Sequence, residues 1–486
     1  MSGLFGSLNS ATSGMTSAQT VLQTISHNVA NANTDGYSKQ RVTLETNNPF
    51  NKSGVGQLGT GVRVSGVIRV VDDAVVEQLR DENSTLAKFE SKSDALQQLE
   101  AIFNEPSKTG LSNNLSEVFA SWTYLGSNPE IATAKTMVVQ NSETMTDTMN
   151  HMATQLEKLQ GNTLKGIEQD VKDFNTKLEQ LHSLNKQVSY SISSGQTPND
   201  LLDKQDALLS EMSELAGVEV KFDEMRQATV SIGGQELLTP TNMQKLAVVT
   251  EVNEDTPEGL EKGSIVLAGD SSKEIILTSG SAKGSQEALA EINKQVANLN
   301  DFAYTFASAV NTIHSGNGDV DGKPFFDLGA DGNYAKNISV QSELAKDPEK
   351  VSSGKSLDKP AAGDGSRAQA IADLQNTKLN FSNPTKIDYD ETTMTIKNQA
   401  NGTSVSNGYN DIVTEIGITK QQSDNMFSSQ EDLVQLLDQR RQSISGVSIN
   451  EEVASMIQHQ SAFQANSRMI STISEMLDTL INRTGV

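Results

Sequence analysis

The feature that most constrains this chain is a heptad pattern at its beginning. Apolar residues recur in a strict alternation of four and three positions, at Leu4, Leu8, Ala11, Met15, Ala18, Leu22, Ile25 and Val29. A mean spacing of 3.5 residues is typical of a coiled-coil seam, in which one helix packs along another. The remaining faces carry Ser, Thr, Asn and Gln with hardly a charge. The segment is therefore expected to be a helix that needs partners.

The end of the chain carries a second apolar stripe, which can pack against the first. It consists of Ile449, Val453, Met456, Phe463, Ile470, Ile473, Leu477 and Leu480. Ser448 and Glu451 form the Ser-x-x-Glu pattern of a capping box, which marks a helix start. Gln460 and Ser467 are expected to interrupt the stripe at seam positions. We interpret the two stripes as an assembly interface that pairs within one subunit and then between subunits.

Neither terminal helix is expected to be stable alone. Burying the eight seam side chains of residues 4–29 gains less free energy than ordering that segment costs, and backbone hydrogen bonds add little net stability. We therefore predict that the ends are disordered in the monomer and fold on assembly.

Composition narrows the class of protein. Only 35% of the 486 residues are hydrophobic, which favours elongated domains and long two-faced helices over one compact sphere. The 62 acidic and 38 basic residues give a formal net charge of -24. This charge would repel phosphate and argues against a nucleic-acid partner. The absence of cysteine excludes disulfides, thiolate nucleophiles and cysteine-bound zinc.

No segment indicates a membrane protein. No apolar run approaches the roughly 20 residues that span a bilayer, so no membrane insertion is expected. The first residues, MSGLFGSLNSATSGM, have neither a basic start nor an apolar stretch. We therefore expect no cleaved secretory signal peptide.

The middle of the chain is organised as nested parts. Helical periodicity covers residues 72–104, a long stretch from Pro129 to Gly195, and residues 199–216, 285–313 and 407–446. Short strand-like runs such as VEVKF and ATVSIGG fill residues 217–284.

The predicted fold class is mainly α with an inserted β domain and discontinuous, nested domains. A terminal coiled-coil pair comprises residues 1–35 and 446–486. A long-helix bundle comprises residues 36–216, 285–315 and 365–445. An outer β-rich domain comprises residues 217–284, to which 316–364 could belong.

Motifs that could carry chemistry are weak. Residues 54–59 match GxGxxG, but no strand is expected before them and no helix after them, so a loop is the preferred interpretation. Asn317, Asp319, Asp321 and Gly322 imitate the start of a calcium loop. The position for a bidentate glutamate is Leu328, so a solvated turn is preferred and weak calcium binding by 317–327 stays open.

The histidines, the tryptophan and the methionines suggest no site either. None of the histidines belongs to a HExxH motif. His151 and His182 are expected to face solvent, and His27 and His459 to lie off the main stripes. Trp122 and the cluster Met145, Met149 and Met152 are expected in the core. We predict no catalytic residue, no cofactor and no metal, and therefore a structural protein.

A resemblance supports that conclusion. Residues 28–37, NVANANTDGY, resemble the N-terminal signature of the flagellar rod, hook and hook-associated proteins, carried here by Asn28, Asn31, Asn33, Gly36 and Tyr37. The asparagines suit a helix end and turn, and Gly36 can take a positive φ. Residues 59–80 and 445–481 also resemble this family. Residues 201–220 and 363–375 are similar to its hook–filament junction members.

The resemblance implies a structural subunit of the bacterial flagellum that joins hook to filament. It implies self-assembly as a ring at the hook tip through the terminal helices. The implied partners are further copies of the chain, the hook protein, the second hook–filament junction protein and an export chaperone. The implied location is extracellular, after type III export without a cleaved signal.

Three alternatives stay open. A hook or distal-rod subunit would carry the same end signatures around a more strand-rich middle. A secreted enzyme would need a catalytic constellation in residues 217–365, and the sequence shows none there. An adhesin or ligand-binding role of the β insert is harder to exclude, because exposed loops often carry binding function.

Overall fold

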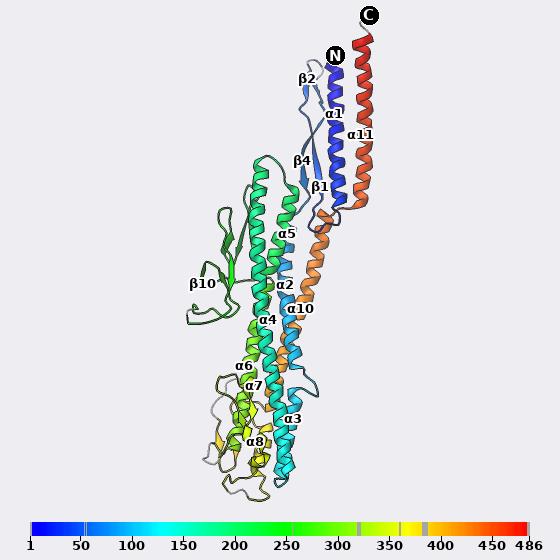
Figure 1. Ribbon diagram of the computed structural model, residues 1–486. Helices are drawn as coiled ribbons and strands as arrows, with labels where there is room; N and C mark the ends of the chain where they lie inside the picture. Colours follow the sequence, from blue (N-terminus) through cyan, green and yellow to red (C-terminus); the bar gives the residue numbers. More distant parts are fainter. Residues whose placement is uncertain are drawn as a thin grey trace.

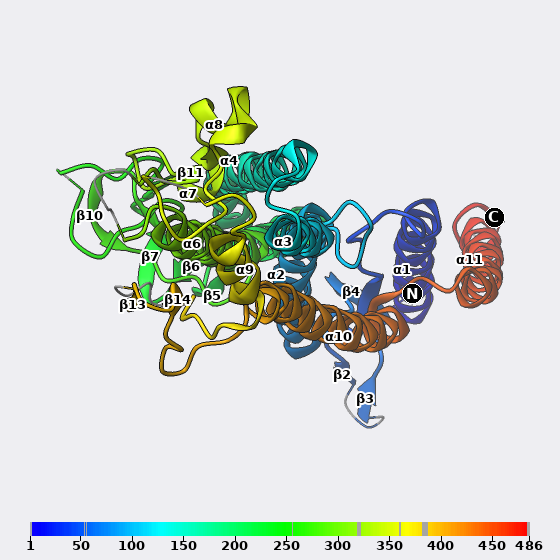
Figure 2. The ribbon, with the colours of Figure 1, turned by 90° about the horizontal axis from the view of Figure 1, so that it is seen from below.

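The computed structural model describes residues 2–483 apart from 53, 55, 255, 318–321, 359–360 and 382–386. Its long helices run roughly along one axis and give the molecule an elongated shape (Figure 1). Both chain ends lie at one pole, where the first and last helices are neighbours (Figures 1 and 2). The predicted fold class, mainly α with an inserted β-rich part, is confirmed.

The helices are α1 (Ser2–Ala30), α2 (Asp73–Phe103), α3 (Leu111–Ser127), α4 (Ala132–Ser193), α5 (Asn199–Ala216), α6 (Ser281–His314), α7 (Tyr334–Asn337), α8 (Ser342–Lys346), α9 (Ser366–Asp373), α10 (Val405–Ser445) and α11 (Ile449–Asp478). Short turns η1 (Pro348–Lys350), η2 (Leu374–Asn376) and η3 (Thr479–Arg483) complete the helical elements. The expected final helix is thus two helices, α10 and α11, separated at Gly446 as predicted.

The strands are β1 (Gln40–Thr46), β2 (Phe50–Lys52), β3 (Gly56–Leu58), β4 (Val62–Arg69), β5 (Glu219–Phe222), β6 (Ala228–Ile232), β7 (Gln235–Leu238), β8 (Leu246–Val248), β9 (Ile265–Leu267), β10 (Asp270–Glu274), β11 (Phe326–Asp327), β12 (Ser339–Val340), β13 (Tyr389–Asp390) and β14 (Thr395–Ile396). They pair antiparallel in small sheets: β1-β4, β2-β3, β5-β6-β7, β10-β9-β8, β11-β12 and β13-β14.

The long helices follow the apolar periodicity closely. α5 spans the predicted residues 199–216. α2 begins after Asp72, whose carboxylate accepts hydrogen bonds from the N–H groups of Ala74 and Val75, and it ends at Asn104 in the left-handed region. α4 has 62 residues, roughly 93 Å at 1.5 Å per residue.

Helix α4 takes part in two large hydrophobic cores and in a small third cluster, in which its Leu184 and Val188 pack with Leu202 of α5. Its first half packs with α3, α6 and α9 around Trp122, Phe302 and Phe306. Its second half packs with α5 and the strands of the β insert. Phe325 and Phe326 belong to the first core, so the segment that follows α6 packs with the bundle. The insert itself lies on one flank of α4 (Figure 1).

The predicted core residues are buried. Trp122 lies edge-on to Phe325 and to His314, and the methionine cluster on α4 is buried as well. The sequence gave no prediction for the burial of His314, which is 1% exposed. Its Nδ1 bonds the carbonyl of Lys323 and its Nε2 accepts from the N–H of Ser352. Burial lowers the pKa of His314 to about 4, so this imidazole is neutral.

Two parts of the fold were missed from the sequence. α3 precedes the break before α4, and the β1–β4 hairpin lies alongside α1 (Figure 1). The expectation that no strand precedes the GxGxxG match is wrong, because β2 ends at Lys52 and β3 begins at Gly56. The chain then continues into β4 and no helix opens there, so a dinucleotide site remains excluded.

Other expectations have mixed outcomes. His151 is exposed as predicted, while His182 is partly buried. Asp319 and Asp321 of the calcium-like pattern lie outside the described residues. Within the described ranges, no three His, Asp or Glu side chains are arranged to hold a metal ion. None of the helices described is apolar over a stretch long enough to cross a bilayer.

Candidate assembly site

α1 and α11 form an antiparallel pair at the pole that carries both termini (Figure 1). All eight predicted seam residues of α1 are buried or partly buried. Ala11, Ala18 and Ile25 are the most enclosed, with 2%, 4% and 4% exposure. A Cβ added to Gly14 would lie 2.8 Å from the amide nitrogen of Asn466 on α11. The small residues of α1 therefore let the two helices approach closely.

The other side of α1 packs on the β1–β4 hairpin. The hydroxyl of Ser13 accepts a hydrogen bond from the N–H of Val62 on β4 at 3.3 Å. Gly61 has a φ of 102°, and a Cβ there would lie 2.2 Å from that hydroxyl. Glycine is thus required both by the backbone conformation and by the close approach. α1 is therefore held between α11 and the hairpin, a support that the sequence did not predict.

On α11 the observed seam agrees with the predicted stripe at Met456, Phe463, Ile470, Ile473 and Leu477 and differs from it elsewhere. Glu452, His459 and Asn466 complete a row of buried or partly buried positions four and three apart, and Ser455 beside this row is partly buried too. Gln460 and Ser467, which were assigned to the seam, are exposed, and His459, which was placed off it, is partly buried. The apolar pattern misled here because a charged residue, Glu452, occupies a seam position.

Several large apolar residues near the end of the chain remain exposed in the described subunit. Of the predicted stripe, Ile449 and Val453 on α11 and Leu480 in the following turn η3 are exposed, so they lie outside the buried seam. Ile457 is 60% exposed and Met469 is 51% exposed. Ser448 begins the helix but makes no side-chain cap hydrogen bond, so the capping box is not formed. α11 thus uses one face inside the subunit and leaves apolar flanks open.

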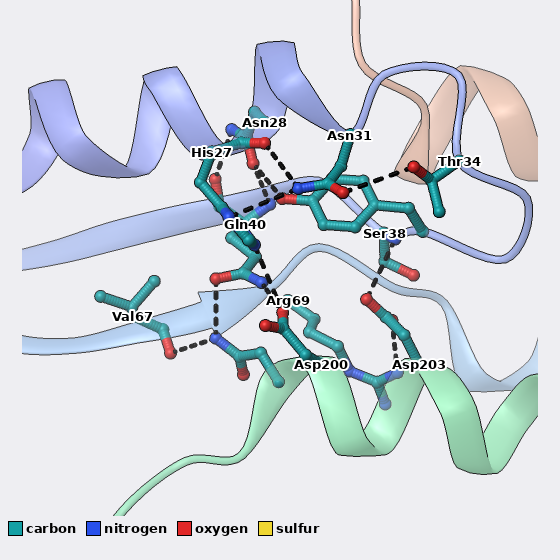
Figure 3. A network of polar contacts seen from close by, with 12 residues as sticks. His27, Asn28, Asn31, Thr34, Ser38, Gln40, Val67, Arg69, Asp200 and Asp203 are labelled. Atoms are coloured by element: carbon teal, nitrogen blue, oxygen red, sulfur yellow. Dashed lines mark hydrogen bonds and ion pairs between the residues drawn. The ribbon is translucent and has the colours of Figure 1, made fainter.

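The family signature forms the polar end of this helix pair. Asn28 is 1% exposed and its amide makes four hydrogen bonds, of which Figure 3 shows those with Gln40. Its Oδ1 accepts from the Tyr37 hydroxyl at 2.7 Å and from the Gln40 N–H at 3.0 Å. Its Nδ2 donates to the Gln40 carbonyl at 3.0 Å and to Glu452 Oε2 at 3.2 Å. All hydrogen-bonding capacity of the amide is therefore used.

The other signature residues shape the turn after α1. Asn31 donates from Nδ2 to the carbonyl of His27 at 3.0 Å, and Gly36 has a φ of 75°. Asn33 is exposed. Burial, together with nearby carboxylates, raises the pKa of Tyr37, so its hydroxyl remains a donor to Asn28. The signature thus ties α1, β1 and α11 together where the terminal pair joins the bundle.

A buried ion pair fixes the hairpin to α5. Nη1 of Arg69 donates to Asp203 Oδ1 and to Asp206 Oδ2, both at 2.8 Å, and the Arg69 side chain is 6% exposed. Burial alone lowers the pKa of Arg69, and the carboxylates of Asp206 and Asp203 more than offset this and raise it. Asp203 also accepts from the N–H of Ser38 at 3.3 Å. This guanidinium therefore stays charged and holds two elements together.

Side-chain amides extend the same network (Figure 3). Gln40 Nε2 donates to Asp200 Oδ1 at 2.8 Å, and Asn199 Nδ2 donates to the carbonyl of Val67 at 2.9 Å. The sequence gave one weak signal for these contacts: Asp203 lies next to Leu202 on the inward face of a helix. A carboxylate at an inward position needs a buried partner.

Comparisons with known proteins bear on this architecture. The family described as "Flagellar hook-associated protein FlgK helical domain" matches residues 96–328. "Flagellar basal body rod FlgEFG protein C-terminal" matches residues 438–483, and "Flagella basal body rod protein" matches residues 8–37. The last two matches cover most of α11 and α1.

Full-length relatives and a solved structure agree with these matches. The chain is 30% identical to flagellar hook-associated protein 1 of Bacillus subtilis, over 100% of this chain and 99% of the relative. It is 25% identical to the protein of that name from Salmonella typhimurium, over 98% and 99%. The flagellar hook junction protein FlgK from Burkholderia pseudomallei has a similar fold, with a TM-score of 0.60 at 17% identity, covering 76% of this chain and 100% of that one.

Proposed function

The chain belongs to the flagellar hook-associated protein 1 family, and from this we propose that it joins the flagellar hook to the filament by assembling as a ring at the hook tip through its terminal helices. Proteins of this family are structural and not enzymes. In this proposal the seam residues of both stripes make the lattice contacts of the ring.

The observation that carries it is the placement of exposed apolar residues on α11. Val453 and Ile457 directly follow seam positions, whereas Met469 and Met476 directly precede them. At about 100° per residue, the two pairs lie on opposite flanks of the seam. A ring formed by one repeated contact needs a different surface on each side of the subunit. Burial of apolar area on both flanks would drive that contact.

The parts of the chain then have separate roles. The terminal part, residues 1–35 and 446–486, forms the ring wall. The bundle, residues 36–216, 285–315 and 365–445, is a stiff body beneath it, and the β-rich residues 217–284 project from its flank. The assembled ring lies outside the cell, where it contacts the hook protein on one side and the second junction protein on the other. An export chaperone covers the terminal helices before assembly.

The alternative of a hook or distal-rod subunit is weaker. Such subunits were expected to have a strand-rich middle, and the middle of this chain is dominated by α2, α4 and α6. A circular-dichroism spectrum dominated by sheet would favour the alternative.

Deletion of residues 1–30 tests the proposal. The shortened protein should retain the folded bundle, measured by cooperative unfolding, and should no longer bind purified hooks. In a separate test, cells that lack the whole chain should show intact hooks without filaments by electron microscopy, and filament protein should be found in the medium. A matched control for the 1–30 deletion removes the exposed loop 251–254 of the insert, which should leave hook binding intact. Hook binding by the 1–30 deletion would refute the role of the ends.

A further inference from the structure

A cavity of 330 Å³ lies at the joint between the terminal part and the bundle. It is enclosed by α2, α5, the end of α10 and the signature loop, which meet just below the terminal pair (Figure 1). Val76, Leu79 and Ala207 form its apolar wall, and Arg80 and Arg441 supply its cationic groups. The cavity can therefore accommodate a side chain with an aliphatic stem and a charged head.

Arg80 is the unusual residue of this cavity. It is 6% exposed, and its Nε has no hydrogen-bond partner. Among the described residues, no carboxylate oxygen forms an ion pair with its guanidinium. Burial lowers the pKa of Arg80, and the surrounding carboxylates do not make up the difference. A buried charge without a partner costs several kcal/mol, so it calls for an explanation.

The acidic groups of the cavity are mostly committed to other cations. Asp206 is paired with Arg69 at 2.8 Å, and Asp438 with Arg441 at 2.9 Å. Glu211 is paired with Lys177 at 2.5 Å. Asp35 is exposed at the rim. The carboxylates of Asp206, Asp81, Glu77 and Asp73 partly compensate the charge of Arg80. Among the described residues none of them forms an ion pair with it, so its guanidinium is the least compensated charge of the cavity.

We propose that this cavity is a socket for an acidic side chain of a neighbouring copy of the chain, with Arg80 as its receptor. The inference rests on the proposed ring. A carboxylate is the planar acceptor that matches a guanidinium fork. The chain carries 62 acidic against 38 basic residues, so the surface of a neighbouring copy is rich in suitable groups. The cavity borders the part of the subunit that contacts its neighbours in the ring.

If the cavity is such a socket, Arg80→Met in the full-length chain should stabilise the monomer and weaken its attachment to hooks. Methionine keeps the length of the side chain and removes the unmatched charge, so the Tm of the monomer should rise by about 1–3 °C. On purified hooks, the same variant should dissociate about tenfold faster or more, because the neighbour's carboxylate is left unpaired. Arg63→Met is the matched control. Arg63 is exposed and paired with Glu45 on the hairpin, so neither quantity should change.

The outcomes separate this inference from the proposed function. If the wild-type chain does not bind hooks at all, the proposed function fails. If the wild type binds and Arg80→Met dissociates at the same rate, the socket is refuted. A Tm that does not rise in Arg80→Met also refutes it, since Arg80 would then have an internal partner. Inorganic phosphate that raises the Tm of the wild type but not of Arg80→Met would assign the site to a small oxyanion instead.

The identity of the occupant can be tested directly. The chain has no cysteine, so Ala207→Cys places a single thiol in the cavity wall. A photoactivatable cross-linker attached there should capture a second copy on assembled hooks and give a product of twice the chain mass. Capture of the hook protein, or no product, would overturn the assignment to a neighbouring copy. Ser183→Cys, on the exposed face of α4, is the control position.

Discussion

The bundle and the terminal pair are both built from long helices, yet they differ in how much they bury. α4 buries residues at almost every inward turn along its length, in two large cores and a small cluster with α5. α11, with 30 residues, buries only Glu452 and Ile473. The bundle therefore buries its apolar faces within one subunit, whereas the terminal pair leaves apolar surface exposed, as the proposed ring requires. The same heptad spacing occurs in a fully packed bundle helix and in a half-covered terminal helix. The two differ in how many neighbouring elements pack against them.

The sharpest test of this difference is amide hydrogen exchange in a dilute monomer. We predict that residues 4–29 exchange at nearly the rate of an unfolded chain, while amides of α4 between 138 and 188 exchange about 10,000-fold more slowly or more. On assembled hooks, residues 4–29 should become protected. Slow exchange of residues 4–29 in the monomer would remove the contrast, and it would mean that α11 and the hairpin suffice to order α1.

A pair of phenylalanine substitutions compares packing in the two regions. Phe306→Ala empties a site at the centre of the bundle core and should lower the free energy of unfolding by about 3–5 kcal/mol. Phe463→Ala, at a partly buried position of α11, should change the main unfolding transition by less than about 0.5 kcal/mol. Urea unfolding monitored by Trp122 fluorescence measures both. Equal losses would show that the terminal pair and the bundle unfold as one unit.

The buried histidine of the bundle gives it a dependence on pH. Because burial lowers the pKa of His314 to about 4, the unfolded chain takes up a proton at higher pH than the folded chain does. The neutral His314 therefore contributes about 3 kcal/mol to the free energy of unfolding. This contribution is fully present above about pH 6.5 and is lost as the pH falls towards 4. The midpoint of urea unfolding should depend less on pH between about 4 and 6.5 in His314→Gln than in the exposed control His151→Gln. Parallel profiles for the two variants would contradict this.

The smallest expected change in monomer stability is at the exposed flank of α11. Ile457→Ala should alter the free energy of unfolding by less than about 0.5 kcal/mol, since the side chain is 60% exposed. The variant should nevertheless dissociate faster from hooks, because it removes apolar area from the proposed contact. Gln460→Ala, also exposed on α11, is the matched control. If both variants dissociate from hooks at the same rate, the proposed contact does not involve Ile457.

The sequence predicted the elements whose information is local. The boundaries of α2 and α5 follow from their apolar period and from Asp72 and Gly217, which flank them. The β1–β4 hairpin was missed because its alternation is weak and its faces are half exposed. Tertiary contacts, rather than local pattern, fix this hairpin. α3 was missed although its 17 residues carry a helical period, with Leu111, Leu115, Val118, Trp122 and Leu125 four and three apart.

The joint could not be predicted, for a different reason. Gln40 and Asp200 are 160 residues apart in the chain, and Arg69 and Asp203 are 134 apart. No periodicity relates such positions, so only their assembly in three dimensions reveals the pairs. The polar seam position of Glu452 on α11 has the same origin, since the amide of Asn28 hydrogen-bonds its carboxylate there. The signature residues marked the right place, although their chemistry was not foreseen.

The single uninterrupted helix α4 has a mechanical consequence. Because it belongs to both cores, the two halves of the bundle cannot slide past each other without breaking packing in one of them. A force applied at one end of α4 would therefore be transmitted along the bundle with little local deformation. The compliance of the subunit is concentrated at the polar joint above it, where the covalent connections are loops and the contacts are hydrogen bonds and ion pairs.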